Sequence, residues 1–193
     1  KAISLVLAGG IVGGTFGPES SKLTRGLLHT AYLGSFLSLI LLATIAIFIL
    51  RRIQLPAPSA EERHGATRPL RTIMAQPAFV VAALGAITAY GVMNLLMVAT
   101  PLAMQVCELP YSDAALVISW HVVGMFGPGL SPGSLIARLA VLPVIACGCL
   151  LMLACVAIAL SGVELMHFLL ALVLLGIGWN FMYTGGTTLL TST

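Results

Sequence analysis

Six long apolar segments, separated by short polar or proline-containing breaks, dominate this chain. A helix needs about 20 mostly apolar residues to cross the hydrocarbon core of a bilayer, and each segment is near that length. Charged residues make up only 8% of the chain, against about 25% in soluble domains, which is too little charge to cover a water-exposed surface. The pattern predicts an all-α, polytopic transmembrane bundle of about six helices, at 2–20, 31–50, 77–104, 114–130, 140–160 and 166–187.

Basic residues are distributed unevenly between the breaks, which gives an orientation. One side of the expected membrane holds only Lys22 and Arg25. The other side holds seven: Lys1, Arg51, Arg52, Arg63, Arg68, Arg71 and Arg138. Because an excess of Lys and Arg marks cytoplasmic loops, we expect the loop at 51–76 to be cytoplasmic. Its low hydrophobicity and lack of periodicity indicate a flexible linker between two membrane halves.

The first apolar segment carries a glycine repeat. Its members recur every four residues in two neighbouring rows, Gly9, Gly13 and Gly17 in one and Gly10 and Gly14 in the other. On a helix such rows form a flat face against which another helix packs closely. Pro18 follows directly and removes a backbone donor where this face ends. A simple packing groove without any further role is the alternative interpretation.

Aromatic, amide and imidazole side chains lie near the middle of three segments. They are Tyr90 and Asn94 in the third, Trp120 and His121 in the fourth, and Trp179 and Asn180 in the sixth. At this depth a polar group either bonds to a neighbouring helix or faces a cavity, and the sequence leaves both open. His121 can be a buried structural residue or a proton-linked one. The spacing also pairs Trp179 with Tyr183 one helical turn later.

Nothing in the sequence indicates catalysis. There is no His-Glu-x-x-His motif and no Gly-x-Ser-x-Gly elbow. Cys147 and Cys149 have no His or Cys partner at zinc spacing. No acidic residue lies in the middle of a segment, which argues against a self-contained proton relay. We therefore expect no enzyme activity, no metal, no cofactor and no nucleic-acid partner.

Three local patterns make the chain resemble the major facilitator superfamily (MFS), specifically bacterial twelve-helix members. The stretch 7–18 is similar to the glycine-rich, Gly-Pro-ending motif of the fifth helix, which is associated with antiporters. The stretch 133–138, including Gly133 and Arg138, is similar to the family's cytoplasmic Gly/Arg loop between helices eight and nine. The stretch 176–191 is similar to the tenth helix. The resemblance covers essentially the whole chain and corresponds to about helices five to ten.

The resemblance implies a domain organisation. Residues 1–50 would be the last two helices of the N-terminal bundle, 51–76 the cytoplasmic linker, and 77–193 the first four helices of the C-terminal bundle. On this interpretation the sequence lacks the remainder of its own chain, namely helices one to four, eleven and twelve, and its start at Lys1 without Met is typical of a cut chain. The expected location is the bacterial inner membrane, as a multi-pass protein in the lipid bilayer.

The resemblance also implies a function, which is secondary transport of a small organic solute by alternating access, with proton-coupled efflux as one mode. The implied substrate-binding residues are Tyr90, Asn94, Trp120, His121, Trp179 and Asn180. Gly9, Gly13, Gly17, Pro18, Gly133 and Arg138 would serve helix packing and gating. The family loop often continues with a glycine or basic residue where this chain has Leu139 and Ala140, which weakens any gating contact there. The alternative is a complete six-helix channel or a half-size carrier that works as a dimer.

Overall fold

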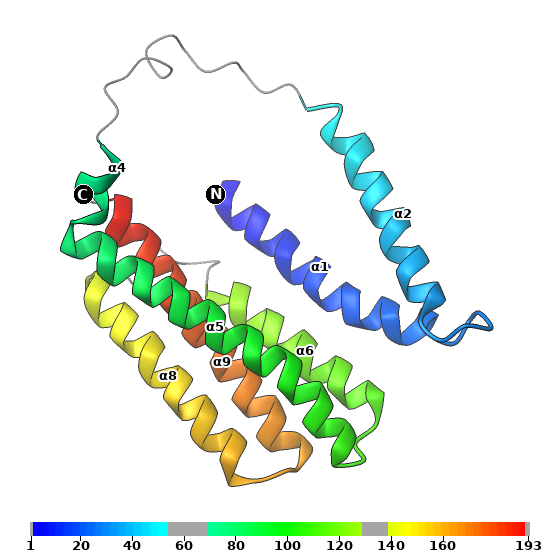
Figure 1. The fold of residues 1–193 in the computed structure, drawn as a ribbon. Coiled ribbons are helices and arrows are strands. Elements are labelled where there is room, and N and C mark those ends of the chain that lie inside the picture. The colour runs from blue at the N-terminus through cyan, green and yellow to red at the C-terminus, as the bar shows by residue number, and fades with distance from the viewer. Residues whose placement is uncertain (1, 54–68, 129–138, 192–193) are drawn as a thin grey trace. The chain divides into compact units, whose positions relative to one another are not determined.

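The structure is a computed structural model that describes residues 2–53, 69–128 and 139–191. These residues form helices and connecting turns, with no strand among them. The helices are α1 (Ala2–Thr24), α2 (Leu33–Leu50), α4 (Leu70–Met74), α5 (Pro77–Val106), α6 (Tyr111–Phe126), α8 (Val141–Ser161) and α9 (Leu165–Thr191) (Figure 1). The prediction of an all-α architecture is confirmed.

Within the described ranges, four helices are long and apolar enough to cross a membrane, namely α2, α5, α8 and α9. The protein is therefore an integral, multi-pass membrane protein. The other two expected spans correspond to α1 and α6, and the described part of α6 has 16 residues. Helix α5 begins with Pro77 in its first turn, where the missing N–H would have no intrahelical partner in any case. At 30 residues it is longer than a perpendicular crossing needs.

The chain divides into two compact units. The first comprises Lys1–Glu19 and Gln76–Thr193, and the second comprises Ser20–Ala75. This grouping differs from the predicted division at residues 50 and 76. That division concerned the two bundles of a larger protein, so it is not tested by this grouping and stays a prediction.

Helix α9 forms the centre of the first unit, where it packs against α5, α6 and α8 (Figure 1). It is the most buried of the four apolar helices and contributes Leu172 and Leu175 to the core. Glycines allow its close contacts on two sides. A Cβ added to Gly178 would lie 2.9 Å from the carbonyl oxygen of Gly148 on α8, and one added to Gly124 on α6 would lie 2.7 Å from that of Val173. Small residues bring helix backbones together in this way in membranes, where apolar side chains gain little by leaving lipid.

The second unit contains the end of α1 and the whole of α2, joined through hydroxyl groups. The Ser35 side chain is buried, and its Oγ lies 3.2 Å from Oγ1 of Thr24 and 3.4 Å from Oγ of Ser21. Beyond this contact the α2 side chains from 39 to 50 are exposed, and nearly all of them are apolar. A helix that is apolar on all sides is suited to contact with lipid or further helices.

Candidate functional site

Three aromatic side chains form a cluster between α5 and α9. Tyr90 comes from α5, and Trp179 and Tyr183 come from α9. The rings of Trp179 and Tyr183 are stacked, with centroids 4.9 Å apart and planes 6° apart. Tyr90 stands edge-on to both, 5.4 Å from Trp179 and 5.9 Å from Tyr183. These are the offset-stacked and edge-to-face arrangements that aromatic pairs prefer.

Local sequence explains why the three rings meet. Trp179 and Tyr183 are one turn apart on the same face of α9. Small residues bring α5 close enough for Tyr90 to reach them, since Ala82 and Ala89 are buried and a Cβ added to Gly186 would lie 3.6 Å from the carbonyl oxygen of Ala82. The cluster therefore follows from a close approach of the two helices.

The members of the cluster differ in exposure. Trp179 is 6% exposed, whereas Tyr90 and Tyr183 are 41% and 40% exposed. The indole Nε1 of Trp179 is buried and has no hydrogen-bond partner within the part of the chain that the structure describes. The arrangement is a covered donor flanked by two accessible phenol rings.

Asn94 lies one turn after Tyr90 on α5 and is exposed. Its Nδ2 donates a hydrogen bond to the Tyr90 carbonyl oxygen at 2.9 Å, within the same helix. This bond therefore does not link α5 to a neighbouring helix. Of the sequence-predicted residues, Tyr90 and Trp179 thus meet at the α5–α9 seam, and Asn94 lies on an exposed face of α5.

His121 and Asn180 have different surroundings, at the interface of α6 and α9. His121 is fully buried, and its Nδ1 lies 2.8 Å from the Leu172 carbonyl oxygen, which can only accept. Nδ1 therefore carries a proton. Asn180 Nδ2 donates to the Met125 carbonyl oxygen at 2.7 Å. Both side chains therefore join α6 to α9. For polar groups at this depth the sequence had left two alternatives, a bond to a neighbouring helix or a position facing a cavity, and these two bonds correspond to the first.

Trp120 is 49% exposed on α6 and belongs to neither group. It directly precedes the buried His121, so the two side chains leave the helix about 100° apart. The structure thus divides the six predicted binding residues into two at the α5–α9 seam, two at the α6–α9 interface, and two, Asn94 and Trp120, on exposed faces of α5 and α6. Their proposed role in substrate binding stays a prediction.

The glycine repeat packs through its second row. A Cβ on Gly10 would lie 3.1 Å from the Phe126 ring, and one on Gly14 would clash with the Val122 side chain, both on α6. Around the Cβ positions of Gly9, Gly13 and Gly17 no other packing atom of the described chain lies within 4 Å. Pro18 lies inside α1 and is partly buried. Gly133 and Arg138 fall outside the described residues, so their predicted gating role is not addressed.

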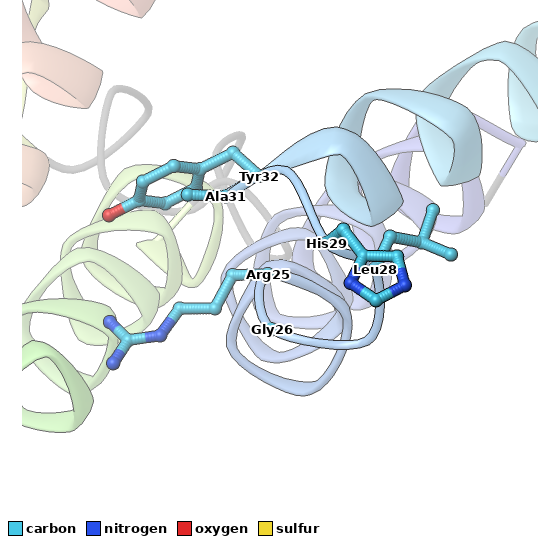
Figure 2. A pocket seen from close by; sticks show the side chains of 6 residues that line it. All are labelled: Arg25, Gly26, Leu28, His29, Ala31 and Tyr32. Carbon is cyan, nitrogen blue, oxygen red and sulfur yellow. The ribbon is translucent and has the colours of Figure 1, made fainter.

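A separate pocket of about 440 Å³ lies in the second unit, at the turn between α1 and α2 (Figure 2). Its lining residues are Arg25, Gly26, Leu28, His29, Ala31 and Tyr32. Figure 2 shows Arg25 and Tyr32 extending to one side and His29 lying on the other. Because the two basic side chains do not converge, the pocket offers no concentrated charge for an anion.

In the described ranges no group of three His, Cys, Asp or Glu side chains could hold a metal ion. The four cysteines are unpaired, and only Cys155 is fully buried.

Comparison with known proteins finds transporters that are similar to this chain. The riboflavin transporter RfnT of Brucella anthropi is 36% identical over 194 residues, which is 99% of this chain and 49% of the relative. The uncharacterized MFS-type transporters YdeG and YddS of Bacillus subtilis are 37% identical over 101 residues and 34% identical over 113 residues. Those alignments cover 51% and 58% of this chain, and 24% and 26% of the relatives. The chain is therefore similar to MFS-type transporters. The resemblance seen in the sequence is confirmed, and the chain spans about half the length of RfnT. No family model and no solved structure matches it.

The sequence did not predict every residue that forms the aromatic cluster and the close helix contacts. Tyr183 was paired with Trp179 by spacing but was not among the predicted binding residues, and its contact with Tyr90 depends on another helix. Gly176 and Gly178 lie in the stretch that resembles the family's tenth helix, and their close backbone contacts to α6 and α8 had no separate signal.

Proposed function

We propose that the protein moves a small organic solute across a membrane by alternating access, with the solute contacting the aromatic cluster at the α5–α9 seam. The single observation that carries this is the cluster itself, in which the accessible Tyr90 and Tyr183 lie beside a buried Trp179 donor that has no partner in the described ranges. The transporter names of the relatives support the activity.

The depth of the cluster supports a solute route. Tyr90 and Asn94 flank the centre of α5, and Trp179 lies at the centre of α9. Side chains that face lipid at mid-depth are apolar as a rule, because polar groups there lack partners. Exposed phenol and amide groups at this level are suited to a water-filled cavity.

Riboflavin is the first solute to test, because RfnT, which aligns with 99% of this chain, is named as a riboflavin transporter. Riboflavin carries a planar fused ring that can stack on phenol and indole rings. Its polar chain and ring carbonyls offer hydrogen-bond groups to Asn94 and the tyrosine hydroxyls.

Direction, coupling ion and orientation are further parts of the proposal. We propose the inner membrane as location, with the loop at 51–76 in the cytoplasm, on the excess of basic residues there. Proton-coupled efflux rests on the antiporter-associated glycine motif alone. His121 is the mid-membrane group that could carry a proton, although its Nδ1 is bonded to Leu172.

The test is transport by the native protein in proteoliposomes, with radiolabelled riboflavin and a panel of other vitamins, nucleosides and drugs. Each solute is measured in both directions, with and without a pH gradient. Saturable movement of any solute, reduced by Tyr90→Ala and unchanged by Cys147→Ala on the exposed face of α8, supports the proposal. A folded protein that moves none of the panel refutes it.

A further inference from the structure

The aromatic cluster has a property that sets which solutes it can hold. It combines a stacked pair of rings with a hydrogen-bond donor that has no partner within the described residues, the indole Nε1 of Trp179. We infer that this site, resting on the transport function proposed above, selects planar aromatic solutes that present a hydrogen-bond acceptor at the ring edge, and that Trp179 Nε1–H donates to that acceptor.

The stacking arrangement supports the planar part of the inference. Trp179 and Tyr183 are parallel within 6°, and Tyr183 is the accessible ring of the pair. A flat solute that accepts from the in-plane Nε1–H would lie in the plane of the indole, so it would be parallel to Tyr183 and could stack on that ring beside the indole. Tyr90 stands at 86° to Tyr183 and closes one side of that position, which disfavours bulky, non-planar solutes.

The donor supports the acceptor part of the inference. Buried polar groups in proteins are nearly always hydrogen-bonded, and each exception requires an explanation. Asn180, the next residue along α9, follows this rule, because its side chain is hydrogen-bonded to Met125. Both tyrosines beside the indole are about two-fifths exposed, and in this proposal a shift of Tyr90 admits the solute to Nε1. A solute acceptor would then satisfy a donor for which the described part of the chain supplies no partner.

Two probes of the same shape test the planar part and the acceptor part of the inference separately. Acridine and anthracene are both flat tricyclic rings, and only acridine has a ring nitrogen that accepts a hydrogen bond. Their binding to the native protein in lipid nanodiscs is measured by equilibrium dialysis above the pKa of acridine, with protein-free nanodiscs as the correction for partition into lipid.

Trp179→Phe keeps an aromatic ring and removes the N–H. We expect it to weaken acridine binding about tenfold and to leave anthracene binding unchanged, since a hydrogen bond of this kind contributes roughly one factor of ten. Tyr183→Leu should weaken both probes by a similar factor, because stacking does not depend on the acceptor. Cys147→Ala, on the exposed face of α8, is the control and should change neither.

Several results overturn the inference. Equal loss of both probes in Trp179→Phe would mean that the indole only shapes the site. Unchanged acridine binding in that variant would mean that the solute does not accept a hydrogen bond from Nε1. If wild-type protein binds neither probe while it transports a non-planar solute, the proposed function stands and this inference falls. If it transports nothing, the proposed function fails first.

Discussion

Replacing Gly176 with alanine should force α6 and α9 apart. A Cβ at this position would overlap the His121 carbonyl oxygen, and it would lie 2.8 Å from the Met125 nitrogen and 3.0 Å from the Gly124 carbonyl carbon. All three are backbone atoms, so no side-chain rotation can make room. The helices must separate, and two hydrogen bonds between them are stretched as a consequence, one from His121 to Leu172 and one from Asn180 to Met125.

The size of the effect follows from three contributions. Overpacking of a close contact costs about 1–3 kcal/mol. Each weakened interhelical hydrogen bond in a membrane adds about 0.6 kcal/mol. Alanine recovers up to about 1 kcal/mol in helix propensity. The net loss is about 2 kcal/mol, and at about 2–4 °C per kcal/mol for a chain of this size the Tm falls by about 4–8 °C.

The assay is thermal unfolding of the detergent-solubilised native protein, followed by intrinsic fluorescence and by loss of the monodisperse peak in size-exclusion chromatography. Gly91→Ala on α5 is the matched control, because no packing atom of the described chain lies within 4 Å of its Cβ position. It should have an unchanged or slightly higher Tm. The reasoning is refuted if Gly176→Ala unfolds at the same temperature as Gly91→Ala.

Two further substitutions test other contacts. Gly14→Leu should lower the Tm or the activity through its clash with Val122, whereas Gly13→Leu, one residue away, should be tolerated; the reverse order would mean that the other glycine row packs in the native protein. His121→Asn places an amide donor near the Nδ1 position and should keep the Tm within about 1 °C, whereas His121→Leu removes the bond to Leu172, worth about 0.6–1.7 kcal/mol, and should lower the Tm by about 1–7 °C. If His121→Asn is stable but its transport no longer responds to a pH gradient, the imidazole carries a proton in addition to its structural bond.

The helices could be predicted from the sequence because lipid imposes one simple condition. Backbone groups in a bilayer must bond within their own segment, so about 20 apolar residues in a row specify a helix almost regardless of tertiary contacts. The i, i+4 spacing likewise paired Trp179 with Tyr183. The same spacing could not predict that Tyr90 joins them, because Tyr90 lies on another helix.

The direction of each side chain was harder to predict. The two glycine rows differ by about 100° around one helix, and both consist of the same residue. Only the positions of Phe126 and Val122 on α6 decide which row is in contact. The partners of His121 and Asn180 are backbone carbonyl groups 51 and 55 residues away, and a carbonyl group has no sequence signature.

Hydrogen-bond pairing separates the structural polar residues from the candidate solute contact. His121 Nδ1 and Asn180 Nδ2 each donate to a carbonyl oxygen on the facing helix, so these two residues already have a structural role. Two nitrogen atoms near them lack a partner in the described part of the chain, His121 Nε2 and Trp179 Nε1. His121 is fully enclosed between α6 and α9, whereas Trp179 borders two accessible tyrosines. Reaching the first nitrogen would separate two hydrogen-bonded helices, whereas reaching the second would require only a side chain to move, so we propose Trp179, and not His121, as the residue that a solute contacts.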